Sequence, residues 1–193
     1  MLGDSLSLGN SLLNELLGGV ILALIGFVSI WFLRPKVKIS PNIAKKKGDN
    51  GENIYSIKVI NSSYIFQLLD IRFELTKLKP ETASKGMNIK IKTINLKSDH
   101  IWFLSRRKGR INKLFSKNDY ATYAIIIDVV EDACQIDDWK EEAKNAVYYD
   151  LKVISKNNFS GITSINHEKF SDPSCIEKGR FEHGNTTTIK NND

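Results

Sequence analysis

Hydrophobic residues follow two different patterns along this chain. Residues Leu16–Leu33 form a continuous apolar run in which Ser29 is the only strongly polar side chain. Between residues 37 and 167, apolar and polar residues instead alternate in short segments that are separated by turn-forming residues. A continuous run of this length is typical of a membrane-crossing helix, and alternation is typical of strands with one buried face. The sequence therefore predicts a single N-terminal transmembrane helix followed by an all-β domain.

The apolar run approaches the thickness of a bilayer, because its residues would rise about 27 Å as an α-helix. We expect the helix to begin near Ser11, since Ser11 and Asn14 can cap a helix N-terminus. It should end at Arg34, because the residue before Pro35 is disfavoured in helical backbone. A cleaved signal peptide would need basic residues before the run, and residues 1–15 contain none. A buried core helix would need a larger protein around it.

Basic residues follow the run closely and none precedes it. Arg34, Lys36 and Lys38 come first, and Lys45–Lys47 come next. The positive-inside rule places such a flank in the cytoplasm. We therefore expect a single-pass protein of the inner (cytoplasmic) membrane with its N-terminus outside. Residues 1–35 would be the N-terminal segment and helix, residues 36–185 a cytoplasmic β-sandwich domain, and residues 186–193 a polar, frayed tail.

One face of the predicted helix carries small and polar residues. At about 100° per residue, the members of this face fall within an arc of roughly 80°: Ser11, Glu15, Gly19, Gly26 and Ser29. Small residues let helix backbones approach closely, so we interpret the face as a pore lining or helix-packing surface in a homo-oligomer. The alternative is that Glu15 is an ordinary interfacial residue and that the glycines share a face by chance.

The β domain is predicted to contain seven or more strands. The alternating or apolar segments are residues 37–40, 54–60, 69–75, 89–94, 123–130, 149–154 and 161–167. Their period of two favours antiparallel sheets, and their number favours a β-sandwich. One short helix is expected at residues 137–146, where acidic residues begin the segment.

Three stretches of the β domain carry a resemblance through their order and spacing. They are Val59–Asn61 with Asp70–Leu75, Ile126–Asp132 with Tyr149–Ile154, and Phe159–Thr163 with Glu177–Phe181. In this order they resemble the opening hairpin, the middle and the last strands of the cytoplasmic domain of inward-rectifier potassium channels. The resemblance covers most of residues 50–183. It implies an immunoglobulin-like sandwich with one short helix and a tetrameric assembly.

The chain departs from that channel family in its membrane part. It has one predicted membrane helix where the family has two, and it contains no segment that resembles the TVGYG selectivity filter. The resemblance therefore does not imply a potassium-selective pore. In architecture, without a shared motif, the chain also resembles small membrane effectors of bacterial anti-phage defence. Among these, the chain resembles the effector of the Hailong system, which is itself similar to a nucleic-acid-gated channel subunit.

Positive charge is most concentrated just after residue 105, in a chain of net charge +6. The candidate ligand-binding residues there are Arg106, Arg107, Lys108, Arg110 and Lys113. Three interpretations remain open. The loop is solvated, it contacts anionic lipid headgroups, or it binds a phosphate-bearing nucleotide or oligonucleotide. In the last case Trp102 and Phe103 could stack on bases, although both could instead be core residues.

Catalytic chemistry is not indicated by the sequence. With only two cysteines and three histidines, it offers no paired-histidine metal motif and no phosphate-binding glycine loop, so we expect no catalytic residue, metal or cofactor. The expected function is a homo-oligomeric membrane effector or ion-channel subunit, with a tetramer favoured, whose cytoplasmic domain senses a ligand in antiviral defence. Its partners would be the lipid bilayer, its own copies and a nucleotide or oligonucleotide. The alternative is a passive membrane-anchored interaction module that recruits a cytoplasmic partner.

Overall fold

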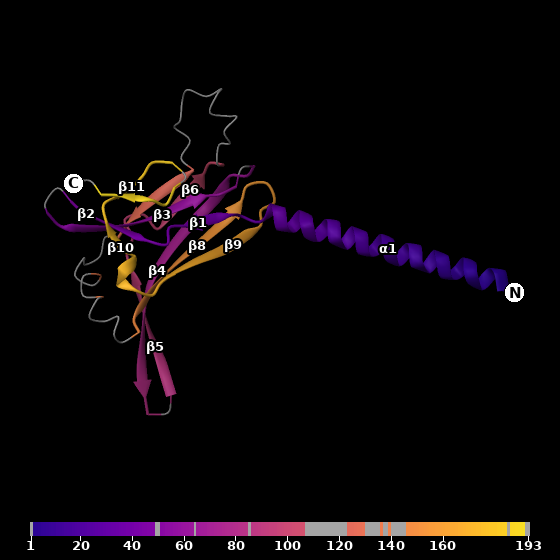
Figure 1. The fold of residues 1–193 in the computed structure, drawn as a ribbon, viewed down its shortest axis with the longest axis horizontal. Helices are drawn as coiled ribbons and strands as arrows, with labels where there is room; N and C mark the ends of the chain where they lie inside the picture. Colours follow the sequence, from indigo (N-terminus) through magenta and orange to yellow (C-terminus); the bar gives the residue numbers. More distant parts are fainter. Residues whose placement is uncertain are drawn as a thin grey trace, which may run out of the picture. The chain divides into compact units, whose positions relative to one another are not determined.

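The chain divides into two compact units, residues 1–34 and residues 35–193. The first is helical and the second is built mostly of β-strands (Figure 1). The computed structural model describes residues 2–48, 51–63, 65–84, 86–106, 123–129, 136, 139, 146–184 and 186–191, with the backbone alone for residues 2–14.

The helical unit consists of α1, Leu2–Leu33. The predicted helix and its end before Pro35 are confirmed, but the helix begins well before Ser11. The prediction that the helix begins near Ser11 with that residue as its cap is wrong, because the residues from Leu2 onward are already helical. Within the described residues, one segment, Glu15–Leu33, is long and apolar enough to cross a membrane. Its large apolar side chains are exposed, which is the arrangement a bilayer would cover.

A first five-stranded sheet is organised around β3. It comprises β1 (Val37–Ile39), β2 (Ile43–Lys47), β3 (Asn53–Asn61), β7 (Ala124–Asp128) and β10 (Ile176–Lys178). β1 and β2 follow one another along one edge of β3, and β7 pairs with its other edge. β10 pairs with β2 in parallel. The prediction of wholly antiparallel pairing is therefore wrong at this edge.

A second five-stranded sheet is organised around the long strand β4. It comprises β4 (Leu68–Ala83), β5 (Gly86–Ile94), β6 (His100–Leu104), β8 (Tyr148–Asn157) and β9 (Thr163–Phe170). β8 pairs with one edge of β4, while β6 and β5 follow one another along the other edge. The predicted hairpin of β8 and β9 is confirmed.

The two sheets share one hydrophobic core. Ile57 and Val59 of β3 contribute from the first sheet, and Phe73 of β4 and Val153 of β8 contribute from the second. All four are nearly inaccessible to solvent. These positions follow the alternation in the sequence, because successive side chains of a strand point to opposite faces. A single helix followed by a β-rich domain is thus confirmed.

Between β7 and β8 in the sequence, Trp139 adds one large aromatic residue to this core. Trp139 is fully buried, donates a 3.0 Å hydrogen bond from Nε1 to the carbonyl of Val147, and packs edge-on against Tyr149. Trp139 and Ile136 are helical, and both lie in or beside the predicted short helix. Most of residues 137–146 lie outside the described residues.

Two hairpins extend this framework. β4 and β5 continue as an arm, formed by residues 76–93, whose outer part beyond the last pair with β8 is two-stranded and projects from the sheets in Figure 1. Near the C-terminus, β11 (Arg180–Phe181) pairs with β12 (Ile189–Lys190). Residues 189–190 were expected to be frayed and instead form this short strand.

Candidate anion-binding site

The predicted basic segment begins at Arg106, which is exposed directly after β6. Arg107, Lys108, Arg110 and Lys113 lie outside the described residues. The two ends of the segment meet at one residue, because Asn61 donates from Nδ2 to the carbonyl of Ser105 (3.0 Å) and from its backbone N–H to the carbonyl of Tyr123 (2.9 Å). The segment is therefore attached where β3 ends.

Trp102 and Phe103 are surface residues, with exposed fractions of 78% and 57%. The alternative that they belong to the core is wrong. β6 pairs along one edge with β4 and buries Leu104 rather than its two aromatic residues.

The predicted small and polar helix face is open in the single chain. Glu15, Gly19, Gly26 and Ser29 are all exposed. A Cβ atom added at Gly19 or Gly26 would meet no other atom within 4 Å, so a neighbouring helix could approach there. Ser29 donates to the carbonyl of Ile25 within the helix (2.8 Å). Ser11 lies on the same helix, and its side chain is outside the described part.

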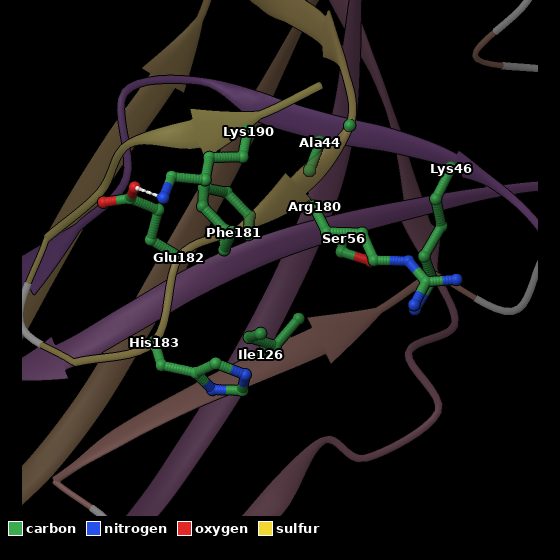
Figure 2. Close-up of a pocket in the computed structure, with 10 residues that line it drawn as sticks. Ala44, Lys46, Ser56, Ile126, Arg180, Phe181, Glu182, His183 and Lys190 are labelled. Atoms are coloured by element: carbon green, nitrogen blue, oxygen red, sulfur yellow. Dashed lines mark ion pairs between the residues drawn. The ribbon is translucent and has the colours of Figure 1, made fainter. Parts of the chain in front are cut away.

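A groove with a strongly basic lining lies elsewhere in the β domain, beside β2 and the C-terminal hairpin (Figure 2). It consists of two cavities of about 640 and 600 Å³ that share Lys46, Gly179 and Arg180. We call it the basic groove. Its described lining residues are Ala44–Lys47, Asn53, Ser56, Ile126, Lys178–His183 and Lys190.

Pairing of distant strands brings the basic residues of this groove together. β2 carries the consecutive lysines Lys45–Lys47, and its parallel contact with β10 places Lys178 opposite Lys45. The amide of Gly179 donates to the carbonyl of Lys45 (3.0 Å), which directs the chain into β11. Arg180 follows, and in Figure 2 its side chain extends toward Lys46.

Lys58 fastens the C-terminal hairpin against the first sheet. This lysine is only 2% exposed, and its Nζ donates to the carbonyls of Glu182 and Thr186, the second at 2.8 Å. Burial lowers the pKa of Lys58, and the carboxylate of Glu182 opposes that shift. A buried amine thus holds the segment that connects β11 and β12.

The charge of the groove is strongly positive. Its described lining contains six lysine or arginine side chains and one carboxylate, that of Glu182. Glu182 is already paired with Lys190, whose Nζ lies 2.8 Å from Oε1 and whose pKa this hydrogen bond raises. Lys46 lies 3.7 Å from Asp128. The remaining positive charge favours an anionic ligand.

Phosphate groups suit this lining better than bases do. Arginine can bind phosphate through two parallel hydrogen bonds, and lysines add point charges around it. The aromatic residues nearby offer little stacking surface, because Phe181 is 6% exposed and Tyr55 is 2% exposed. Among the residues that the structure describes, no group of three His, Cys, Asp or Glu side chains could hold a metal ion. The groove is therefore a candidate site for a phosphate-bearing anion.

Sequence reasoning missed this groove. The signals were the runs Lys45–Lys47 and Lys178–Arg180, but nothing in either run indicates that they become neighbours.

Cys175 lies beside the same edge and packs against the core. Burial, together with the charge of Asp172, raises the pKa of Cys175 to about 12, so its thiol is a packing group and a poor nucleophile.

Neither a protein-family model nor a curated protein sequence matches this chain.

Proposed function

We propose that this protein is a homo-oligomeric membrane effector or ion-channel subunit of bacterial anti-phage defence, in which a cytoplasmic immunoglobulin-like β-sandwich senses a phosphate-bearing ligand. The observation that carries the proposal is the basic groove. Each of its two cavities, about 640 and 600 Å³, lies in the range of small-molecule sites, about 300–1,000 Å³. A nucleotide or a short oligonucleotide is the ligand class that fits the charge.

The membrane part of the proposal depends on α1. Its apolar residues favour insertion, and the basic residues after it favour a cytoplasmic β domain with the N-terminus outside the inner membrane. The face formed by Glu15, Gly19, Gly26 and Ser29 would turn toward the axis of the oligomer, for which a tetramer is favoured by the channel resemblance. Opening of such an assembly would dissipate the membrane potential.

The groove is a better candidate for the ligand site than the segment that begins at Arg106. Its charges converge on one concave surface and come from three parts of the chain: β2, the β10–β11 segment and β12. Arg106 is instead attached at the other end of β3. The two sites can be separated by experiment because no residue is common to them.

The test uses the full-length protein in detergent and a fluorescent oligodeoxynucleotide as the probe. We expect Lys46→Ser with Arg180→Ser to weaken binding and to reduce the log–log salt slope by about 1.4, since each neutralised phosphate contributes roughly 0.7 to that slope. A matched control, Lys79→Ser with Lys90→Ser on the arm, removes the same charge outside the groove. We expect it to leave the slope unchanged.

A second variant assigns the binding to the groove or to the loop. If serine substitution of Arg106, Arg107, Lys108 and Arg110 abolishes binding and the groove variant does not, the ligand site lies in the loop. If the wild-type protein shows no binding of oligonucleotide or of inorganic polyphosphate, the sensing proposal is wrong.

One observation favours the second candidate, a membrane-anchored interaction module. The arm carries exposed apolar side chains on one face, Met87, Ile89 and Ile91, with exposed fractions from 54% to 69%. Lysines alternate with them on β5. A module of this kind would dock a cytoplasmic partner on the arm and would need no oligomer. The mass of the detergent-purified protein separates the two candidates, since an effector with a pore requires several copies.

A further inference from the structure

Large apolar side chains are exposed together at the end of the β domain where β3 ends. Trp102 is 78% exposed, Phe159 75% and Ile65 66%. The rings of Phe66 and Phe159 stack with their centroids 5.8 Å apart. Leu69, Trp102 and Phe103 line a cavity of about 580 Å³ beside them. We call this set the aromatic cluster: Ile65, Phe66, Leu69, Trp102, Phe103 and Phe159.

Two buried asparagines hold these residues in place. Asn61, fully buried, donates from Nδ2 to the carbonyl of Phe66 (3.0 Å) in the β3–β4 loop and to that of Ser105 after β6. Asn157, 1% exposed, accepts hydrogen bonds at Oδ1 from the amides of Phe159 (2.8 Å) and Ser160. The apolar side chains are thus displayed by an ordered polar framework. Their exposure is a property of the fold and does not come from a loose loop.

The same end of the domain receives the chain from α1. The carbonyl of Lys36 accepts hydrogen bonds from the amide (2.8 Å) and the hydroxyl (2.9 Å) of Ser62, in the β3–β4 loop that carries Ile65 and Phe66. The carbonyl of Pro35 accepts one from Ser164, just beyond the turn that carries Phe159. Only Arg34 separates Pro35 from the last residue of α1. At no more than about 3.6 Å per residue, such a short link keeps this end close to the membrane.

The charges around the aromatic cluster suit lipid headgroups. Lys156 lines the cavity beside Trp102, and Lys36 and Arg106 are exposed at the same end. The one carboxylate in that lining, Asp70, is already bound by His100 (2.9 Å) and Arg72 (3.3 Å). Aromatic rings at the headgroup level with basic side chains beside them are typical of a protein surface at the membrane interface.

We propose that the aromatic cluster inserts among the lipid headgroups and forms a second membrane contact of the β domain. This inference rests on the membrane-spanning α1 of the proposed function. The contact would fix the orientation of the domain relative to the bilayer, which a single flexible link at Arg34 would leave free. The basic groove, attached to the other half of β3, would then face the cytoplasm.

The test uses the intrinsic tryptophans of the full-length protein in vesicles of phosphatidylcholine and phosphatidylglycerol. Lipids brominated near the headgroup or deep in the acyl chain quench tryptophan at the corresponding depth. The difference between the wild type and Trp102→Phe isolates Trp102. The remaining signal reports Trp31 of α1 and the buried Trp139, whose emission also verifies that each variant is folded. We expect the shallow bromines to quench Trp102.

Matched variants examine the contact itself. Ile65→Asp with Phe159→Asp should reduce the quenching of Trp102 by about half or more, since charged side chains disfavour the interface. Met87→Asp with Ile89→Asp, an equally exposed apolar pair on the arm, should leave it unchanged.

The outcomes separate this inference from the proposed function. Quenching of Trp31 without quenching of Trp102 overturns the inference and leaves the membrane effector standing. Protection of Trp102 from both the bromolipids and aqueous acrylamide also overturns it, because the cluster would then contact protein. If Trp31 is not quenched by either lipid, α1 does not enter the bilayer, and both proposals fail.

Discussion

The basic groove and the aromatic cluster are both built on β3, yet the lining of the groove is mainly charged and the cluster is mainly apolar. The groove lies over the half of the strand that contains Ser56 and displays positive charge. The cluster surrounds the end of the strand at Asn61 and displays rings. Five residues of strand, about 17 Å, separate these two positions. If both proposals hold, one strand would support a site for an aqueous anion and a surface for lipid at the same time.

The buried polar groups at the two regions also differ in kind. At the groove a charged amine, Lys58, satisfies backbone carbonyls of the C-terminal hairpin. At the cluster two neutral side-chain amides, those of Asn61 and Asn157, form the hydrogen bonds to backbone groups. Charge can be titrated and neutral amides cannot, so the two regions should respond differently to substitution and to pH.

The largest expected effect is at the cluster. Asn61→Ala removes the donor shared by the carbonyls of Phe66 and Ser105, and leaves them without that partner in a buried site. We expect the free energy of unfolding to fall by about 2–4 kcal/mol, measured by urea denaturation in detergent with Trp139 fluorescence. The exposed Asn158→Ala is the control. Equal losses for both variants would show that the end of β3 is not organised by Asn61.

Alanine substitution of one glycine in each region should give the next largest difference in stability. Gly179, at the groove, has φ +134° and a Cβ added there would lie 2.1 Å from the carbonyl of Lys190. Gly161, near the cluster, has φ +69° with ordinary space around it. We expect Gly179→Ala to lower stability by about 1–3 kcal/mol and to displace β12, with weaker oligonucleotide binding. Gly161→Ala should cost about 1 kcal/mol and leave binding intact. The reverse order would argue against the hairpin as a wall of the groove.

The pH dependence of stability should distinguish the charged region. The pKa of Lys58 is lowered in the folded protein, so the unfolded chain holds more protons between that value and 10.5. The free energy of unfolding of the wild type should therefore rise with pH in this window, by at most about 1.4 kcal/mol per pH unit. Lys58→Met lacks this rise. The free energy of unfolding of the wild type relative to that of Lys58→Met should therefore be larger at pH 10 than at pH 7. An equal difference at the two pH values would contradict a buried, titrating amine.

The smallest effect concerns Asp70, beside the cluster. The hydrogen bond from His100 is the main cause that lowers the pKa of Asp70, with Arg72 contributing. Its stabilising contribution is present above the ordinary carboxyl pKa and is lost as the pH falls through the folded value. We expect His100→Ala to raise the pKa of Asp70 and to destabilise the protein slightly at neutral pH. His167→Ala, which removes a 3.2 Å contact with Asp150, should leave the pKa of Asp70 unchanged.

The sequence predicted the parts of the fold that depend on local periodicity. Alternation in β4 and β8 identified inward residues such as Phe73 and Val153, whereas β3 is buried on both faces from Tyr55 to Asn61, which alternation did not predict. The same alternation does not show whether another part of the protein covers the apolar face of a strand. β5 alternates like a half-buried strand, but Met87, Ile89 and Ile91 are exposed, because periodicity reports an apolar face and not its partner.

The candidate site was less predictable than the fold. The groove depends on the parallel contact of β2 with β10, which joins Lys45 to Lys178 across most of the chain. No local pattern encodes such a pairing. Burial within the run Ile101–Leu104 could not be predicted for another reason. It lacks alternation, so its sequence could not show that Leu104 is buried while Trp102 and Phe103 face outward.

The fastening of the C-terminal hairpin by Lys58 has a consequence for biosynthesis. α1 is synthesised before β3 with its lysine, and the carbonyls of Glu182 and Thr186 are made long after both. A nascent or prematurely terminated chain would therefore be anchored before it had a groove. Under the proposed function, ligand sensing would begin only after translation had passed residue 186.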